Sequence, residues 1–70
     1  MQYLVIIERC STGFSAYVPD LPGCVAAGDT RDEVTHLMHE AIELHLSDMR
    51  ETGQTIPEPM TSSELVAVAA

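Results

Sequence analysis

The sequence has no lysine, and its only basic residues are the three arginines Arg9, Arg31 and Arg50. Eleven aspartates and glutamates oppose them, which gives a formal net charge of −8 at pH 7. Because proteins hold nucleic-acid phosphates chiefly with Lys and Arg, this balance argues against direct binding of DNA or RNA. The charge favours association with a basic partner, although acidity also serves simply to keep a small protein in solution.

Long apolar runs and a basic leader are missing too. No apolar stretch approaches the roughly 20 residues that a membrane-spanning helix requires. Met1 and Gln2 place no basic residue before the first apolar run, so the N-terminus does not resemble a secretory signal. We therefore expect a cytoplasmic protein with free thiols at Cys10 and Cys24, and a disulfide bond between them as the less favoured alternative.

Motifs of catalysis are equally scarce. The four glycines lie far apart, at positions 13, 23, 28 and 53, so they form no phosphate-binding loop, and no nucleophile elbow or CxxC motif is present. Glu8 and Asp20 fall near expected strand ends, but nothing in the sequence brings them together as an acid–base pair. We expect no enzymatic activity, no cofactor and no metal.

The apolar pattern predicts one α+β domain over residues 1–70, in the order β-β-β-α-β. Tyr3–Ile7 is rich in β-branched residues and is expected as a central strand that is buried on both faces. Phe14–Val18 alternates, and Cys24–Gly28 is a third strand of small residues, so short connections give a three-stranded antiparallel meander. A core this small favours self-association as a homodimer or homotetramer.

One long helix follows the meander. Thr30 and Glu33 form a capping box, and Gly53 is placed to end the helix after about Thr52. An apolar stripe is expected to pack on the sheet, and its residues are Val34, Leu37, Met38, Ala41, Ile42, His45 and Met49. Leu44 and Leu46 lie off the stripe and point to an oligomer interface.

The last residues predict a short closing strand. Glu64–Val68 is apolar apart from its first residue. Because strand–helix–strand connections are right-handed, this strand should lie parallel beside a central strand of the sheet.

The histidines of the helix raise the question of a metal site. His36, His39 and Glu43 are neighbours on one helix face, a spacing that metal sites also use. We interpret them as a solvated acidic face, because they lie away from the apolar stripe and no cysteine accompanies them. His45, within the stripe, is expected as a half-buried residue bonded to the sheet, with a pH-sensitive contact as the sharper alternative.

The segment from Tyr17 to Gly28 contains the most specific signal. Pro19 and Pro22 lack backbone donors, so Asp20–Gly23 is predicted as a stiff bend, which any small α+β domain could use as a connector. Several motifs of the chain resemble the HicB antitoxin family. They are Gly-Phe-Ser-Ala-Tyr-Val-Pro-Asp-Leu-Pro-Gly-Cys at 13–24, Gly-Asp-Thr at 28–30, Glu33, and Glu-Ala-Ile-Glu-Leu-His-Leu at 40–46. Ile-Pro-Glu-Pro at 56–59 fits as well, so the resemblance covers nearly the whole chain.

That resemblance implies a partial ribonuclease-H-like fold without nuclease activity. Members of the family bind and sterically neutralise a small basic toxin of the HicA family, which cleaves mRNA. The motif that resembles the family suggests a partner-binding segment made of Tyr17, Pro19, Asp20, Leu21, Pro22 and Gly23. Many members also carry a C-terminal DNA-binding domain, which we expect to be absent here because the sequence ends at Ala70.

Two other functions remain open at this point. One is a stand-alone oligomeric HicB-like domain with a structural or regulatory role and no toxin. The other is a metal-dependent nuclease on the ribonuclease-H-like fold, which would need clustered acidic ligands that the sequence does not display.

Overall fold

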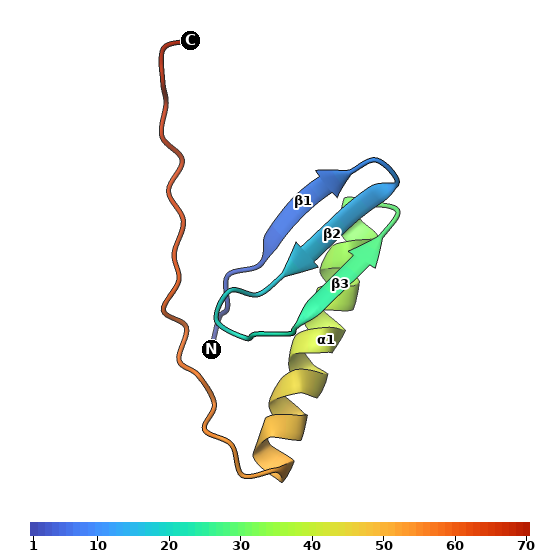
Figure 1. Cartoon of the computed structure of the whole chain (residues 1–70), viewed down its shortest axis with the longest axis vertical. Helices are drawn as coiled ribbons and strands as arrows, with labels where there is room; N and C mark the ends of the chain where they lie inside the picture. Colours follow the sequence, from blue (N-terminus) through green and yellow to red (C-terminus); the bar gives the residue numbers. More distant parts are fainter.

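The computed structural model describes all 70 residues and shows a three-stranded antiparallel sheet packed on one helix (Figure 1). The elements are β1 (Ile6–Cys10), β2 (Gly13–Tyr17), β3 (Val25–Gly28) and α1 (Arg31–Glu51). The strand order is β1-β2-β3, so β2 is the central strand. The predicted α+β meander is confirmed.

The alternation of β2 separates a helix-facing side of the sheet from an outer side. Ala16 is buried and Phe14 packs against the core, whereas Tyr17 is 42% exposed on the opposite face. Tyr17 is paired with Ile6 on β1 and with Val25 on β3. These three side chains therefore form one apolar row across the outer face of the sheet.

The position of β1 differs from the prediction. The strand begins at Ile6 rather than Tyr3, and it lies at the edge of the sheet rather than in its centre. Pairing with β2 continues to Cys10 and Gly13, so the connection is only Ser11 and Thr12. Residues 8–10, which lie beyond the predicted strand Tyr3–Ile7, belong to β1 because the register with β2 provides them with hydrogen-bond partners.

Both ends of α1 are capped. The Thr30 hydroxyl accepts a hydrogen bond from the Glu33 amide at 3.1 Å, as predicted, but the Glu33 carboxylate accepts from the amide of Asp29 rather than that of Thr30. At the other end Gly53 has a φ of +73°, and the amides of residues 53 and 54 donate to the carbonyls of residues 50 and 49. This is a Schellman motif, and it ends the helix where the sequence predicted. The helix does not combine the length and the apolar character that a membrane span needs.

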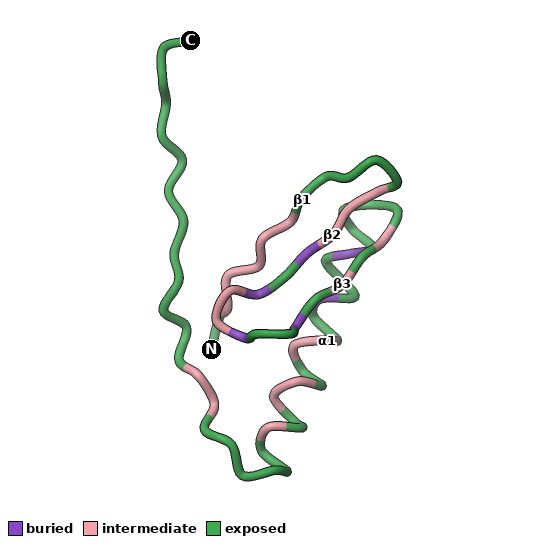
Figure 2. The backbone as a smooth tube through the Cα atoms, viewed as in Figure 1, coloured by how far each residue is buried: buried purple, intermediate pink, exposed green.

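The core is small and lies under the first half of the helix (Figure 2). From α1 only Val34 and Met38 are fully buried, and Leu37 is 36% exposed at the margin of the predicted stripe. Further along, His45 and Met49 are only half-buried. The full set of buried residues is Ala16, Val18, Leu21, Cys24, Val34 and Met38.

The predicted closing strand is not formed within the single chain. Glu64–Val68 has no strand partner, and every residue of the segment is exposed. The chain after α1 runs past the N-terminal residues and then away from the sheet (Figure 1). No strand pairs with the outer side of β1, so β1 is an edge strand of the sheet.

Candidate functional site

The predicted stiff bend is built from two consecutive turns. The Leu21 amide donates to the Val18 carbonyl, and the Cys24 amide donates to the Leu21 carbonyl, each at 3.1 Å. Pro19 and Pro22 each occupy the second position of a turn, where their fixed φ is favourable. We call residues 18–24 the double turn.

The double turn closes on itself at its base. The Val18 amide donates to the Cys24 carbonyl at 3.2 Å. Gly23 has a φ of +85°, as the third residue of a type II turn requires. The loop is therefore held by three backbone hydrogen bonds and two prolines, and it is rigid before any partner arrives.

One side of the double turn faces the core. Leu21 is fully buried and Cys24 is 3% exposed. The Leu21 side chain packs inside the domain, and the predicted partner contact of this residue stays a prediction. Burial raises the pKa of the Cys24 thiol, so the thiol stays protonated, and both Cys24 and the exposed Cys10 are free.

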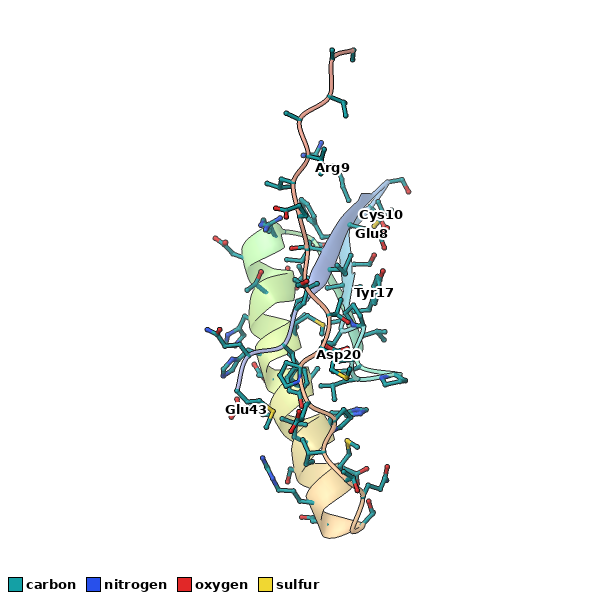
Figure 3. The ribbon with its side chains drawn as sticks, turned by 90° about the vertical axis from the view of Figure 1, so that its left-hand side faces the viewer. Glu8, Arg9, Cys10, Tyr17, Asp20 and Glu43 are labelled. Atoms are coloured by element: carbon teal, nitrogen blue, oxygen red, sulfur yellow. The ribbon has the colours of Figure 1, made fainter.

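Asp20, on the other side of the double turn, holds the distant C-terminal part of the chain (Figure 3). Its carboxylate accepts hydrogen bonds from the amides of Met60 and Thr61, each at 3.0 Å, and from the Thr61 hydroxyl at 2.7 Å. The bonds from Thr61 hold the pKa of Asp20 below its usual value. Nearby, the Tyr3 hydroxyl donates to the Pro57 carbonyl.

These contacts were not predicted from the sequence. Asp20 was expected at a partner surface, but the structure uses it to bind the chain's own backbone forty residues later. The only local signal is the residue type, because a carboxylate can accept from successive amides. Nothing in the spacing of Asp20 and Thr61 indicates that they meet.

An apolar patch lies on the outer face of the sheet beside the double turn. We call Ile6, Tyr17 and Val25 the outer patch, and Val25 is 64% exposed. The double turn adds the exposed Pro22 and Gly23 at one end of this face. A rigid apolar centre on an otherwise acidic molecule has the character of a protein-binding surface.

The histidines of α1 pair with acidic residues one turn along the helix. His36 Nε2 lies 2.7 Å from Glu40 Oε1, and His39 Nε2 lies 3.0 Å from Glu43 Oε1. All four side chains are exposed, so each pair contributes little to stability. No three side chains of His, Cys, Asp or Glu come together in a metal-binding arrangement.

Leu44 and Leu46, predicted together as an oligomer interface, differ in burial but both line a hollow on the surface of α1. Leu44 is 73% exposed beside His45 and Asp48. Leu46 is half-buried, packs against the core and lines a groove between α1 and the N-terminal residues. Their role as an oligomer interface stays a prediction.

Comparison with known proteins places the chain in a defined group. The family described as the HicB-like antitoxin of bacterial toxin-antitoxin systems matches residues 3–69. "Antitoxin HicB 2" of Photorhabdus laumondii is 33% identical over 64 residues, which are 91% of this chain and 46% of that protein. An uncharacterized 14.9 kDa protein of Haemophilus phage HP1 is 40% identical over 58 residues, which are 83% of this chain and 44% of that protein.

A solved structure agrees with the sequence matches. A chain of the "HicA3 and HicB3 toxin-antitoxin complex" superposes with a TM-score of 0.73 at 30% sequence identity, covering 86% of this chain and 70% of that chain. The match spans about half the length of the phage and Photorhabdus proteins.

Proposed function

The chain belongs to the HicB-like antitoxin family, and we propose that it binds and sterically neutralises a basic HicA-type toxin that cleaves mRNA. The observation that carries the proposal is the likeness of its fold to a chain from a toxin–antitoxin complex, with a TM-score of 0.73. The proposed action is occlusion of the toxin rather than chemistry. We also propose that the fold is of the partial ribonuclease-H-like class. A cytoplasmic location is proposed with it.

Electrostatics support a basic partner. The net charge is −8, and the acidic residues of α1 are all exposed: Asp32, Glu33, Glu40, Glu43, Asp48 and Glu51. A basic toxin would be steered toward this surface at rates that fall as salt screens the charges. The charge therefore supports a basic partner for the molecule as a whole, whereas the contact surface is argued from exposed apolar area on the face of the sheet away from α1.

We propose that the outer patch and the exposed part of the double turn form the contact. Tyr17 and Val25 supply apolar area that a partner can desolvate, and Pro19, Pro22 and Gly23 supply a rigid border. A preformed loop loses little conformational freedom on binding, which favours affinity. Asp20 would act indirectly, because its carboxylate is already engaged by Met60 and Thr61.

The proposal is tested by co-purification with a HicA-type toxin encoded beside the gene. Only the toxin is tagged, and the mass of the complex is measured by light scattering at low and high salt. We expect a stable complex that Val25→Asp weakens at least roughly tenfold, since a charge would be buried at the contact. Leu44→Asp adds the same charge to a similarly exposed position on α1 and should leave binding unchanged.

Failure to associate at either salt concentration would contradict the proposal. It would instead support the alternative of a stand-alone oligomeric HicB-like domain with a structural or regulatory role. If Val25→Asp and Leu44→Asp weakened the complex equally, the antitoxin function would still be supported. The proposal that the outer patch is the contact would be overturned.

A further inference from the structure

An apolar strand-forming segment at the end of the chain has no partner. Within Glu64–Val68, which we call the C-terminal segment, Leu65 is 99% exposed, Val66 74% and Val68 80%. The chain is stretched out in this segment (Figure 1), and Glu64 is its only charged residue. An exposed run of this composition is a ready template for pairing with another strand.

The same molecule offers the complementary surface. β1 is hydrogen-bonded only to β2, so its outer edge presents unpaired amides and carbonyls. Beside that strand lies a groove of about 720 Å³ between the N-terminal residues and α1. Its lining is mainly apolar, with Tyr3, Leu4, Val5, Ile7, Ile42 and Leu46.

The C-terminal segment does not reach the groove of its own chain. Asp20 holds Met60 and Thr61, and Tyr3 holds Pro57, so residues 57–61 are fixed along the domain. Pro57 and Pro59 keep this stretch straight, because each fixes its own φ and favours extended backbone in the residue before it. Beyond Thr61 the chain projects away from the sheet (Figure 1).

We propose that Glu64–Val68 of one copy is added as a strand to β1 of a second copy, with its apolar side chains in that copy's groove. The exchange is reciprocal, because each copy carries both the segment and the edge, and this self-complementarity is what a two-fold dimer requires. Each copy has a charge of −8, but a segment with one carboxylate can pair without placing the acidic faces of α1 against each other.

The exchanged strand runs parallel to β1. A right-handed connection through α1 predicts this direction, and an exchanged element normally occupies the position that it would have in a closed monomer. We place the five residues 64–68 alongside the five residues of β1, Ile6–Cys10, which sets Val68 beside Cys10 of the other copy. The predicted closing strand is then present in the protein, but between copies rather than within one.

A cross-linking experiment separates exchange from closure within one chain. Cys10 is exposed and free, and Val68→Cys introduces a second exposed thiol. Two such cysteines form a disulfide only when their Cα atoms approach within about 7 Å. Under mild oxidation we expect a covalent dimer on a non-reducing gel, whereas Leu44→Cys, with its thiol on α1, should stay mostly monomeric. A bridge within one chain, seen as a faster-moving monomer, would overturn the proposal.

The mass of the chain alone provides a second test that involves no toxin. We expect an even multiple of the 7.6 kDa chain mass by light scattering. The double substitution L65D/V66D places a charge on each face of the strand and should halve that mass while the circular dichroism of α1 persists. The control L44D/M60D adds the same charge at two other exposed apolar positions and should keep the mass.

A monomeric wild-type chain, or a mass that L65D/V66D does not lower, would overturn the proposal. So would an equal loss of mass in the L44D/M60D control. Because these measurements use the chain alone, their failure is distinct from a failure of toxin binding.

Discussion

Asp20 shows how one side chain can connect the two ends of a short sequence. Its carboxylate accepts three hydrogen bonds from Met60 and Thr61, and the double turn that carries it is rigid. The neighbouring Leu21 points the opposite way and is fully buried. Two adjacent residues of the same motif therefore do different work: one fills the core and the other orients the C-terminal part of the chain.

We predict that Asp20→Asn releases residues 60–61. The neutral amide accepts more weakly and offers only one oxygen, so the amides of Met60 and Thr61 should exchange hydrogen at nearly the rate of a free chain. Hydrogen exchange measured by NMR checks this, and Glu58→Gln, an exposed acid in the same stretch, is the control. Unchanged protection in the Asp20 variant would show that the anchor lies elsewhere.

The same contact should depend on pH. Because the pKa of Asp20 is lowered in the folded chain, its contribution is complete above the unfolded value of about 3.9 and is lost as pH falls through the lowered folded value. The amide resonances of residues 60 and 61 should therefore titrate with a midpoint below the ordinary range for aspartate. A midpoint at or above that range would contradict the assignment of the three hydrogen bonds to an ionised carboxylate.

Gly13 is required by its surroundings as well as by its backbone conformation. Its φ is +146°, and a side chain there would collide with the Gly28 carbonyl oxygen. Gly53 also has a positive φ, but open space surrounds it. We predict that Gly53→Ala costs about 1 kcal/mol and that Gly13→Ala costs at least roughly 2 kcal/mol, by chemical denaturation. Equal costs for the two variants would show that the sheet adjusts freely at Gly13.

At the scale of the elements, α1 is specified by local chemistry. The Thr30 hydroxyl caps the Glu33 amide at the start, and the Schellman motif at Gly53 ends the helix. We predict that Thr30→Ala destabilises the domain by about 1 kcal/mol, which lowers Tm by roughly 4–8 °C in a domain of this size. Thr35→Ala, at an exposed position within the helix, should change Tm little. A similar loss in both variants would mean that the cap is not the cause.

Local signals explain why the meander, the bend and the helix could be predicted from the sequence. Alternation in β2 and prolines at turn positions depend only on neighbouring residues. The position of β1 was missed because the strand's limits are set by its register with β2 rather than by its own apolar run. The contact of Asp20 with Thr61 and the fate of Glu64–Val68 depend on distant parts of the chain or on a second copy, and periodicity does not reveal either.

For the whole molecule, charge and shape point to association. The core is small and the exterior is acidic. Two apolar surfaces lie on different sides of the domain, and each could bind a different kind of partner. The outer patch is proposed to meet the toxin, and the groove beside β1 is proposed to receive the strand of a second copy. Since the surfaces are separate, both contacts can exist in one assembly.

The measurement that tests the central claim most directly is RNA cleavage by a purified HicA-type toxin, titrated with this chain at low and high salt. We predict that cleavage stops at a fixed stoichiometry, and that roughly tenfold more chain is needed at high salt, because screening weakens the attraction between an acidic and a basic protein. Val25→Asp should require a further excess, and Leu44→Asp should behave as the wild type. Undiminished cleavage at saturating chain and low salt would contradict the antitoxin function.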